Sequence, residues 1–413
     1  MSFYQVQNPT TFSLSRPAKS AVQDFINDTL YNLSVSESIL MGIGAGVQSQ
    51  RKCSIAIGKD AGKVNQGWVE DSTDDDEQYQ GHAIAIGCEA GVSNQTAYCV
   101  ALGWQAGQFS QGLDGHGTGP DNDNWGSIAI GKQAGQSNQI SDCIAIGIQA
   151  GQENQGGEEG NSIAIGKRAG QSFQSSNSVS IGPNSAVFNQ SSFAIAIGSQ
   201  AGYTGQGYSA LSLGQQAGFF TQANYSVSIG NQAGYSSQAT NCVAIGNQAG
   251  YTGQGQYSVA IGYQAGQNTQ AANSICINAS GAALNTSTSG LYVAPLRAGT
   301  VTTALGYDTS TKEIFYASST RTIKHDIQDY TKDTSGIYNL KPKTFKYNER
   351  PEEGDYMGYI AEETYDADRD LAVIDKEGNP QGINWNNITL FLVEELKKQR
   401  LEIEELKRQL NQK

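Results

Sequence analysis

A sixteen-residue pattern of apolar and polar positions repeats along most of the chain, between residues 37 and 280. Each unit contains a short alternating stretch, Ile or Val, then Ala or Ser, then Ile, and ends it with a glycine. This glycine column runs from Gly44 and Gly58 to Gly262, and from Gly166 onward every spacing is 16 residues. The alternation predicts one short β-strand per unit, with its two branched side chains facing inward.

Two further columns indicate how each unit turns. An Ala-Gly pair follows the strand, where glycine permits a corner that a side chain would obstruct. A glutamine stands eight residues after each column glycine from Gly58 onward. Identical amides stacked at the roughly 4.8 Å strand spacing can donate and accept along the stack, so we expect a continuous ladder. In the regular part of the repeat its members are Gln174, Gln190, Gln206, Gln222, Gln238, Gln254 and Gln270.

Together these columns predict a mostly β fold, a parallel β-roll or β-solenoid over residues 37–280. Three units are longer than 16 residues, and each extra segment follows the ladder glutamine, so insertions leave the coil at one corner. A coil of 16 residues is too thin to bury much surface alone. We therefore expect three chains packed side by side as a homotrimer.

The flanking regions do not repeat. Residues 1–36 contain a predicted amphipathic helix, either a cap on the first coil or a segment for attachment to a larger particle. Residues 281–318 are a β-rich transition, and residues 319–413 form a charge-rich α+β domain. Its last helix, 392–413, carries Leu396, Ile403 and Leu410 at seven-residue spacing, which predicts a trimeric coiled coil; a helix folded back on its own domain is the alternative.

The composition limits which partners, metals and cofactors we expect. A net charge of −13 and a pI near 4.7 argue against nucleic acid as a partner. No apolar stretch approaches the roughly 20 residues of a membrane span, and the chain begins without a secretory signal, so we expect synthesis in the cytoplasm and no membrane insertion. Cys99, Cys143 and Cys242 share one repeat position with Ser and Ala, which predicts small buried thiols, and neither metal nor cofactor is expected.

Three surface features can each be interpreted either as a binding site or as purely structural. Residues 71–77 form an acidic insertion that suits calcium or simply solvent. His116 and Trp125 lie in a second insertion and suit a sugar, although many loops of this composition bind nothing. Tyr203, Tyr235 and Tyr251 recur after the Ala-Gly corner, where we favour packing between chains.

The candidate chemistry lies at the start of the C-terminal domain. Ser319 precedes Lys324 by five residues. The later segments Leu340–Tyr347 and Gly358–Glu363 follow in the same order as the matching segments of a known family. These residues resemble the intramolecular chaperone domain at the C-terminus of phage endosialidases and tail spikes, over about residues 290–413. Residues 384–388 stand where that family has a short strand before its last helix. The 16-residue repeat resembles the head of trimeric autotransporter adhesins, whose signal sequence and membrane barrel are missing here.

The resemblance implies that Ser319 and Lys324 are a catalytic pair that cuts the bond between Ser318 and Ser319. A serine hydroxyl needs a base, and lysine serves as one only when neutral, which burial or a nearby cation promotes. Arg321, His325 and Glu363 are supporting candidates. Ser318 is an adjacent nucleophile at the wrong spacing. Thr320 departs from the usual Asp, Glu362 from Gln and Thr364 from an apolar residue; the first departure could slow cleavage.

The sequence therefore predicts a trimeric viral or phage fibre whose C-terminal chaperone aligns three chains and then cleaves itself off, acting once and only on its own chain. Virion proteins at the N-terminus and a host-surface glycan or receptor are the expected partners. The mature form is expected on the virion. The main alternative is an adhesin or carbohydrate-binding fibre that keeps its C-terminal trimerisation domain.

Overall fold

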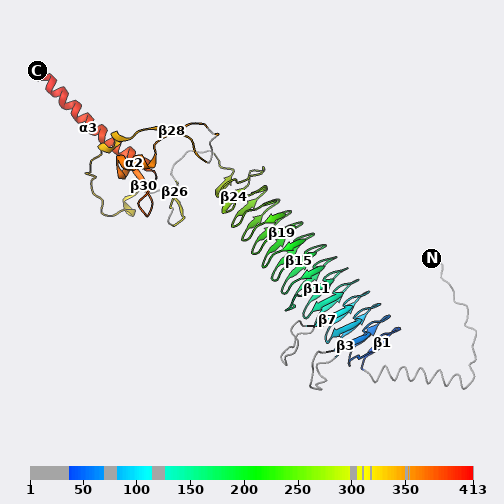
Figure 1. Cartoon of the computed structure of the whole chain (residues 1–413). Helices are drawn as coiled ribbons and strands as arrows, with labels where there is room; N and C mark the ends of the chain where they lie inside the picture. Colours follow the sequence, from blue (N-terminus) through cyan, green and yellow to red (C-terminus); the bar gives the residue numbers. More distant parts are fainter. Residues whose placement is uncertain are drawn as a thin grey trace, which may run out of the picture. The chain divides into compact units, whose positions relative to one another are not determined.

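The computed structural model describes residues 37–68, 81–113, 126–297, 305–308, 311–316, 319–348, 352 and 354–412 (Figure 1). By its internal contacts the chain divides into two units, Met1–Ala298 and Gly299–Lys413, which we call the shaft and the C-terminal unit. The predicted N-terminal helix, the acidic insertion at 71–77 and the residues His116, Trp125 and Ser318 lie outside the described residues.

The shaft is a coil of short parallel strands arranged in two sheets, which confirms the predicted parallel β-solenoid (Figure 1). Each strand pairs with the equivalent strand one coil away, so Ile144 faces Ile128 on one side and Ile163 on the other. The first sheet has 15 strands: β1 Ile39–Met41, β2 Ile55–Ile57, β4 Ile84–Ile86, β6 Val100–Leu102, β8 Ile128–Ile130, β10 Ile144–Ile146, β12 Ile163–Ile165, β14 Val179–Ile181, β16 Ile195–Ile197, β18 Leu211–Leu213, β20 Val227–Ile229, β22 Val243–Ile245, β23 Val259–Gly262, β24 Ser274–Asn278 and β25 Gly290–Ala294. The second has 10: β3 Val64–Trp68, β5 Ser93–Thr96, β7 Phe109–Leu113, β9 Ser137–Ile140, β11 Glu153–Gln155, β13 Ser172–Gln174, β15 Phe188–Gln190, β17 Thr204–Gln206, β19 Phe220–Gln222 and β21 Ser236–Gln238.

The inside of the coil is filled by small side chains, and this corrects the predicted orientation of the strands. In β10 the central Ala145 is fully buried, whereas the flanking Ile146 is 36% exposed. The alternation is as predicted but its phase is reversed: Ala, Ser or Cys faces inward and the branched residues face outward. The reason is space, because the fully buried glutamines of the second sheet occupy the interior and leave room for little more than a methyl group.

From β1 to β22 a glycine follows each strand of the first sheet, and Gly262 ends β23, because adjacent coils approach too closely there for a side chain. A Cβ atom at Gly198 would lie 2.6 Å from the carbonyl oxygen of Gly214, and φ at Gly198 is +130°. The first member of this column is Gly42, at φ +127° beside Gly58, and not the predicted Gly44. A slip of two residues keeps the apolar alternation, so the repeat pattern alone did not separate the two glycines.

The transition region belongs partly to the shaft. Strand β25 pairs in parallel with β24, so the first sheet extends to Ala294. Strands β26 Leu305–Tyr307 and β27 Ile314–Tyr316 form a separate antiparallel hairpin that belongs to the C-terminal unit.

The C-terminal unit is built from short elements around a small core of Ile337, Leu371, Ile388 and Phe391. Its elements after the hairpin are the 3-10 turns η2 Arg321–Ile323, η3 Ser335–Asn339 and η4 Arg369–Leu371, the hairpins β28 Lys343–Phe345 with β29 Tyr356–Gly358 and β30 Ala372–Ile374 with β31 Pro380–Ile383, and the helices α2 Ala361–Ala367 and α3 Trp385–Asn411. Asn384 caps α3 by accepting from the Asn387 backbone N–H at 3.2 Å. Residues 384–388 are therefore the start of this helix, not a strand before it.

Helix α3 presents two different faces. Near its start, Ile388, Phe391 and Glu395 are buried against the rest of the C-terminal unit. A second set of apolar side chains on α3 remains between 48% and 71% exposed: Leu392, Leu396, Ile403, Leu406 and Leu410. The exposed set is the seven-residue pattern noted in the sequence, so within one chain this stripe is uncovered.

Candidate functional site

The structure brings Ser319 and Lys324 into direct contact. The Lys324 Nζ atom donates a hydrogen bond to Ser319 Oγ at 2.6 Å. The turn η2 closes the gap between them, with backbone hydrogen bonds from Ile323 to Thr320 and from Lys324 to Arg321, both 3.3 Å long. The local 3-10 conformation thus places a hydroxyl and an amine five residues apart within hydrogen-bond reach.

Both members of this pair are exposed to solvent in a single chain. An amine in water keeps its proton near neutral pH, whereas a general base must accept one. Contact geometry for nucleophile and base is therefore present, but the described residues of the chain do not bury the pair.

The supporting candidates are placed differently from one another. His325 Nδ1 lies 2.8 Å from Asp326 Oδ2, so the carboxylate would balance any charge on this imidazole. Glu363 lies on α2 and forms an ion pair with Lys343 at 3.1 Å, not with the Ser319–Lys324 pair. Arg321 lies in η2, and within the described residues its guanidinium forms no ion pair.

The segment that follows the Ser319–Lys324 pair is held to the rest of the C-terminal unit by contacts with Asp370, which we call the first anchor. Lys332 Nζ donates to Asp370 Oδ2 at 2.9 Å, and the Tyr330 hydroxyl donates to the same oxygen at 3.2 Å. These contacts, led by the hydrogen bond from Lys332, hold the pKa of Asp370 below its usual range. The same hydrogen bond raises the pKa of Lys332.

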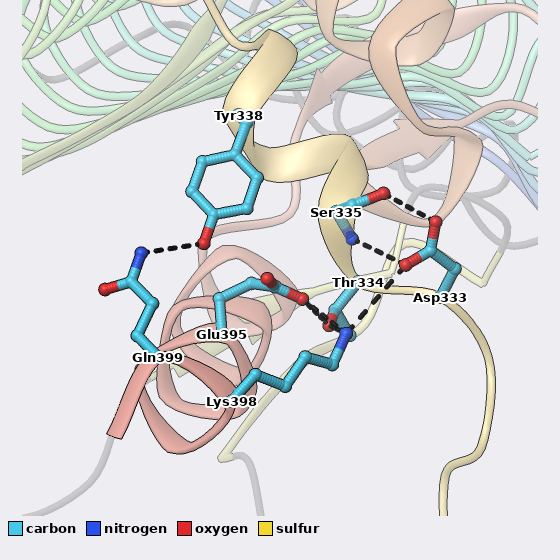
Figure 2. Close-up of polar contacts among 7 residues, drawn as sticks. All are labelled: Asp333, Thr334, Ser335, Tyr338, Glu395, Lys398 and Gln399. Carbon is cyan, nitrogen blue, oxygen red and sulfur yellow. Dashed lines mark hydrogen bonds and ion pairs between the residues drawn. The ribbon is translucent and has the colours of Figure 1, made fainter. Parts of the chain in front are cut away.

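A second anchor joins η3 to α3 (Figure 2). Thr334 donates its hydroxyl hydrogen bond to Glu395, and Lys398 Nζ lies 2.6 Å from the same carboxylate. Glu395 is 7% exposed and its pKa is lowered, chiefly by the hydrogen bond from Lys398. Figure 2 also shows Gln399, whose amide donates to the Tyr338 hydroxyl at 3.0 Å. The network fixes which face of α3 is turned toward its own unit.

The sequence departure at residue 364 has a structural explanation. Thr364 is buried in α2, and its hydroxyl donates to the Ile360 carbonyl oxygen at 2.9 Å. A threonine can thus occupy an apolar position because its polar atom is satisfied within the helix.

The shaft glutamines line the inside of the coil. In all seven named members the amide nitrogen donates to a carbonyl oxygen of a first-sheet strand at 2.8–3.0 Å. Amide-to-amide bonds also join Gln190 to Gln206 at 3.0 Å and Gln206 to Gln222 at 3.3 Å. Between Gln222 and Gln238 the Ser228 hydroxyl bridges the two side chains. The glutamines therefore connect the two sheets, but the ladder is not continuous as predicted. Among the described residues, no amide-to-amide bond joins Gln174 to Gln190 or Gln254 to Gln270, and the side-chain oxygens of Gln174, Gln190 and Gln270 accept no hydrogen bond.

A second glutamine column, which the sequence analysis missed, forms a ladder at the corner after the first-sheet strand. Earlier in the shaft Gln105, Gln133 and Gln149 occupy this column, joined at 3.1 and 3.5 Å. In the regular part of the repeat its five members are Gln200, Gln216, Gln232, Gln248 and Gln264, joined by amide-to-amide bonds of 2.8–3.0 Å. All five have φ between +51° and +59°. The signal was present in the sequence, because glutamine recurs two residues after the column glycine.

The recurrent tyrosines stack within the chain. Tyr203 and Tyr235 lie on either side of Phe219, with ring centroids 4.9 and 5.1 Å apart, and Tyr251 continues the stack at 4.8 Å. The aromatic column is thus a feature of a single shaft, and Phe219 is a member that the sequence pattern overlooked.

In the part of the chain that the structure describes, no group of three or more His, Cys, Asp or Glu side chains is placed to hold a metal ion. None of the described helices has the length and apolar character needed to cross a membrane.

A β-solenoid followed by a small α+β unit fits a protein of the phage fibre or tail-spike type. Residues 319–373 match the family of the chaperone of endosialidase. The match begins at Ser319 and contains Lys324, and it confirms the resemblance seen in the sequence over that segment. Comparisons with curated proteins and with solved structures gave no match.

Proposed function

We propose that this chain is a subunit of a homotrimeric viral or phage fibre and that its C-terminal unit cleaves the bond between Ser318 and Ser319. The observation that carries the proposal is the coincidence of two findings at one residue. The family match begins at Ser319, and Ser319 accepts a hydrogen bond from Lys324 at 2.6 Å.

The proposed reaction uses the chain's own groups and one water molecule. Neutral Lys324 accepts the hydroxyl proton of Ser319 while Oγ attacks the carbonyl carbon of Ser318. The C–N bond then breaks, and the proton passes from Lys324 to the departing amine of Ser319, leaving an ester. Water hydrolyses this ester to a carboxylate on Ser318 and a free hydroxyl on Ser319. The reaction runs once, because its substrate is destroyed.

Two exposed apolar surfaces support the homotrimer. The outward-facing residues of the first sheet form a stripe along the shaft, with Ile195 36%, Ile261 38% and Leu213 41% exposed. The α3 stripe of Leu392, Leu396, Ile403, Leu406 and Leu410 is a second such surface. Contiguous apolar surface in the same chain at both places favours two further copies as the partner, since a parallel three-chain bundle would cover both.

The trimer would also supply what the single chain lacks at the Ser–Lys pair. Packing of neighbouring chains around η2 would exclude water from Lys324 and promote its neutral form. Cleavage would then follow assembly, and it would leave the shaft without a route back to its assembly domain.

In this proposal the chain is made in the cytoplasm of a host cell, and the cleaved fibre is carried on the virion. The N-terminal segment would join virion proteins, and the shaft would present a host-surface glycan or receptor site. The composition supports a role without nucleic acid, because the net charge is −13.

The experiment that tests the proposal is the intact mass, under denaturing conditions, of the wild-type chain and of Ser319→Ala and Lys324→Ala. We expect the wild type to split between Ser318 and Ser319 and both variants to remain whole at 43.9 kDa. A wild type that also remains whole would refute self-cleavage and leave a trimeric fibre that retains its C-terminal unit. Light scattering on Ser319→Ala tests the trimer independently of the reaction.

A further inference from the structure

Thr320 and Thr322 lie on the turn that joins the proposed nucleophile to the proposed base. Their hydroxyl oxygens are 2.8 Å apart, so one hydroxyl donates to the other across the first turn of η2. Neither residue belongs to the reacting pair. Lys324 contacts Ser319 and not Thr320, although the two hydroxyl residues are adjacent in the chain.

The turn η2 is weakly held by its own backbone. Its two closing hydrogen bonds are 3.3 Å long, at the far end of the ordinary range for N–H···O contacts. Thr320 occupies the N-cap position with an extended backbone, and its side chain makes no capping bond to a backbone N–H. A single 3-10 turn with long bonds and no cap has little intrinsic stability.

The hydroxyl bridge spans this same turn. Thr320 directly follows Ser319, and Thr322 lies two residues before Lys324. Fixing Thr320 against Thr322 limits rotation about the backbone at the start of η2, because Thr320 is its N-cap and Thr322 its middle residue. Since Ser319 directly precedes this turn and Lys324 is its C-cap, an ordered turn favours the contact between Ser319 Oγ and Lys324 Nζ.

We infer that Thr320 and Thr322 are a pair of positioning residues for self-cleavage, and that their shared hydrogen bond holds the Ser319–Lys324 contact in its reactive geometry. The inference rests on the proposed function, because it has meaning only if the bond before Ser319 is cut. It assigns Thr320 a contribution of its own at a position where the sequence departs from the family pattern.

The test compares valine, which keeps the shape of threonine and loses the hydroxyl, with serine, which keeps the hydroxyl. Full-length wild type, Thr320→Val, Thr322→Val, the double Val variant, Thr320→Ser and Thr322→Ser are made by cell-free synthesis. Cleavage is followed by timed denaturing gels and intact mass. Thr344→Val, at an exposed threonine in β28, is the matched control.

We expect each Val variant to slow cleavage roughly two- to tenfold, the range that one hydrogen bond of ordinary strength provides. The double variant should be no slower than either single one, because both remove the same bond. Both Ser variants and Thr344→Val should cleave at the wild-type rate. The Val variants should be slowed by the same factor at every pH, since the bridge acts on geometry and not on the Lys324 proton.

Assembly is measured separately by placing each Val substitution in the Ser319→Ala background and determining the oligomeric state. Unchanged assembly with slowed cleavage supports the positioning role. If the wild type cleaves and the Val variants keep its rate, or if Val and Ser variants are equally slow, the inference is wrong while the proposed function stands. A wild type that does not cleave refutes both this inference and the proposed self-cleavage.

Discussion

The shaft and the C-terminal unit are stabilised in opposite ways. In the shaft each contact is a copy of the one before it, as when Ile195 pairs with Val179 on one coil and Leu211 on the next. In the C-terminal unit the polar anchors are all different, such as Lys332 with Asp370 and Thr334 with Glu395. Repeated contacts define the structure of each coil well, but they do not determine which coil of one chain packs against which coil of another.

This difference bears on the proposed assembly of three chains. If three shafts pack along their apolar stripes, a shift of one whole coil would place nearly equivalent residues opposite one another. The energy difference between the correct and shifted arrangements would be small. Apart from the seven-residue stripe of α3, the described residues of the C-terminal unit have no internal repeat to shift along, so the information that aligns three chains would lie there.

The largest effect is expected from a side chain in the glycine column of the shaft. Gly198→Ala should destabilise the shaft by more than about 3 kcal/mol, because a non-glycine residue at strained φ alone costs about 1–3 kcal/mol. Its methyl group would in addition lie 2.6 Å from the Gly214 carbonyl oxygen. Thermal unfolding followed by circular dichroism measures the change.

Gly281→Ala is the matched control for this substitution. Its φ is also positive, at +78°, but an added Cβ would meet no atom within 4 Å. The difference between the two variants isolates the close approach of neighbouring coils. Equal losses would show that stacking distance does not limit the residue at Gly198.

A smaller effect is expected from the glutamines, with inner and outer columns differing. Gln206 is 1% exposed, and its amide donates to the Ile195 and Ala210 carbonyl oxygens at 2.8 and 3.2 Å. Gln206→Ala should cost about 2–4 kcal/mol, through a cavity and buried carbonyl groups left unpaired. Gln216→Ala in the half-exposed outer column should cost about 0.5–1.5 kcal/mol, because water can replace its partners. Chemical denaturation of both variants tests the order, and a larger loss at Gln216 would contradict it.

The last expected effect, which is absent near neutral pH, is a difference in pH sensitivity between the two units. Burial raises the pKa of Cys99 to about 11 and that of Cys143 to about 12, from an ordinary value of 9.0. The folded shaft therefore keeps these thiols protonated. Their contribution to the stability of the shaft is complete below pH 9 and is lost as the pH rises toward 11–12. In the C-terminal unit the lowered pKa values of Asp370 and Glu395 give the opposite sign: stability is present above the ordinary carboxyl range and is lost in acid.

Two variants check this contrast by unfolding measured across pH. Replacing Cys99 and Cys143 together by serine, which occupies the same column at Ser127, should reduce the alkaline loss. Asp370→Asn should reduce the acid dependence of the C-terminal unit. An unchanged alkaline profile in the serine variant would show that these thiols do not govern the response.

Sequence reasoning succeeded where a pattern is imposed by the backbone and failed where it depends on available space. The strand positions and the glutamine column follow from period and spacing alone, and both could be predicted. The direction in which Ile146 points could not, because alternation has two phases and only the width of the coil interior selects one. The same ambiguity placed the first column glycine at Gly44 instead of Gly42.

In the candidate site, too, a local contact could be predicted from the sequence, whereas contacts between distant segments could not. The resemblance to the chaperone family implied the pairing of Ser319 and Lys324, and a single turn is enough to bring residues so close in sequence into contact. The ion pair of Glu363 with Lys343 and the anchors at Asp370 and Glu395 depend on contacts between distant segments. Lys398 and Thr334, for example, are 64 residues apart. Such contacts leave no periodic signal in a single sequence.

The two glutamine ladders run with opposite polarity. In the inner ladder Gln190 donates to Gln206, toward the C-terminus, whereas in the outer ladder Gln216 donates back to Gln200. Aligned amides carry dipoles that add along a stack, so two opposed stacks offset each other. Where both ladders are bonded, from Gln190 to Gln222, each added coil therefore contributes amide dipoles of both senses.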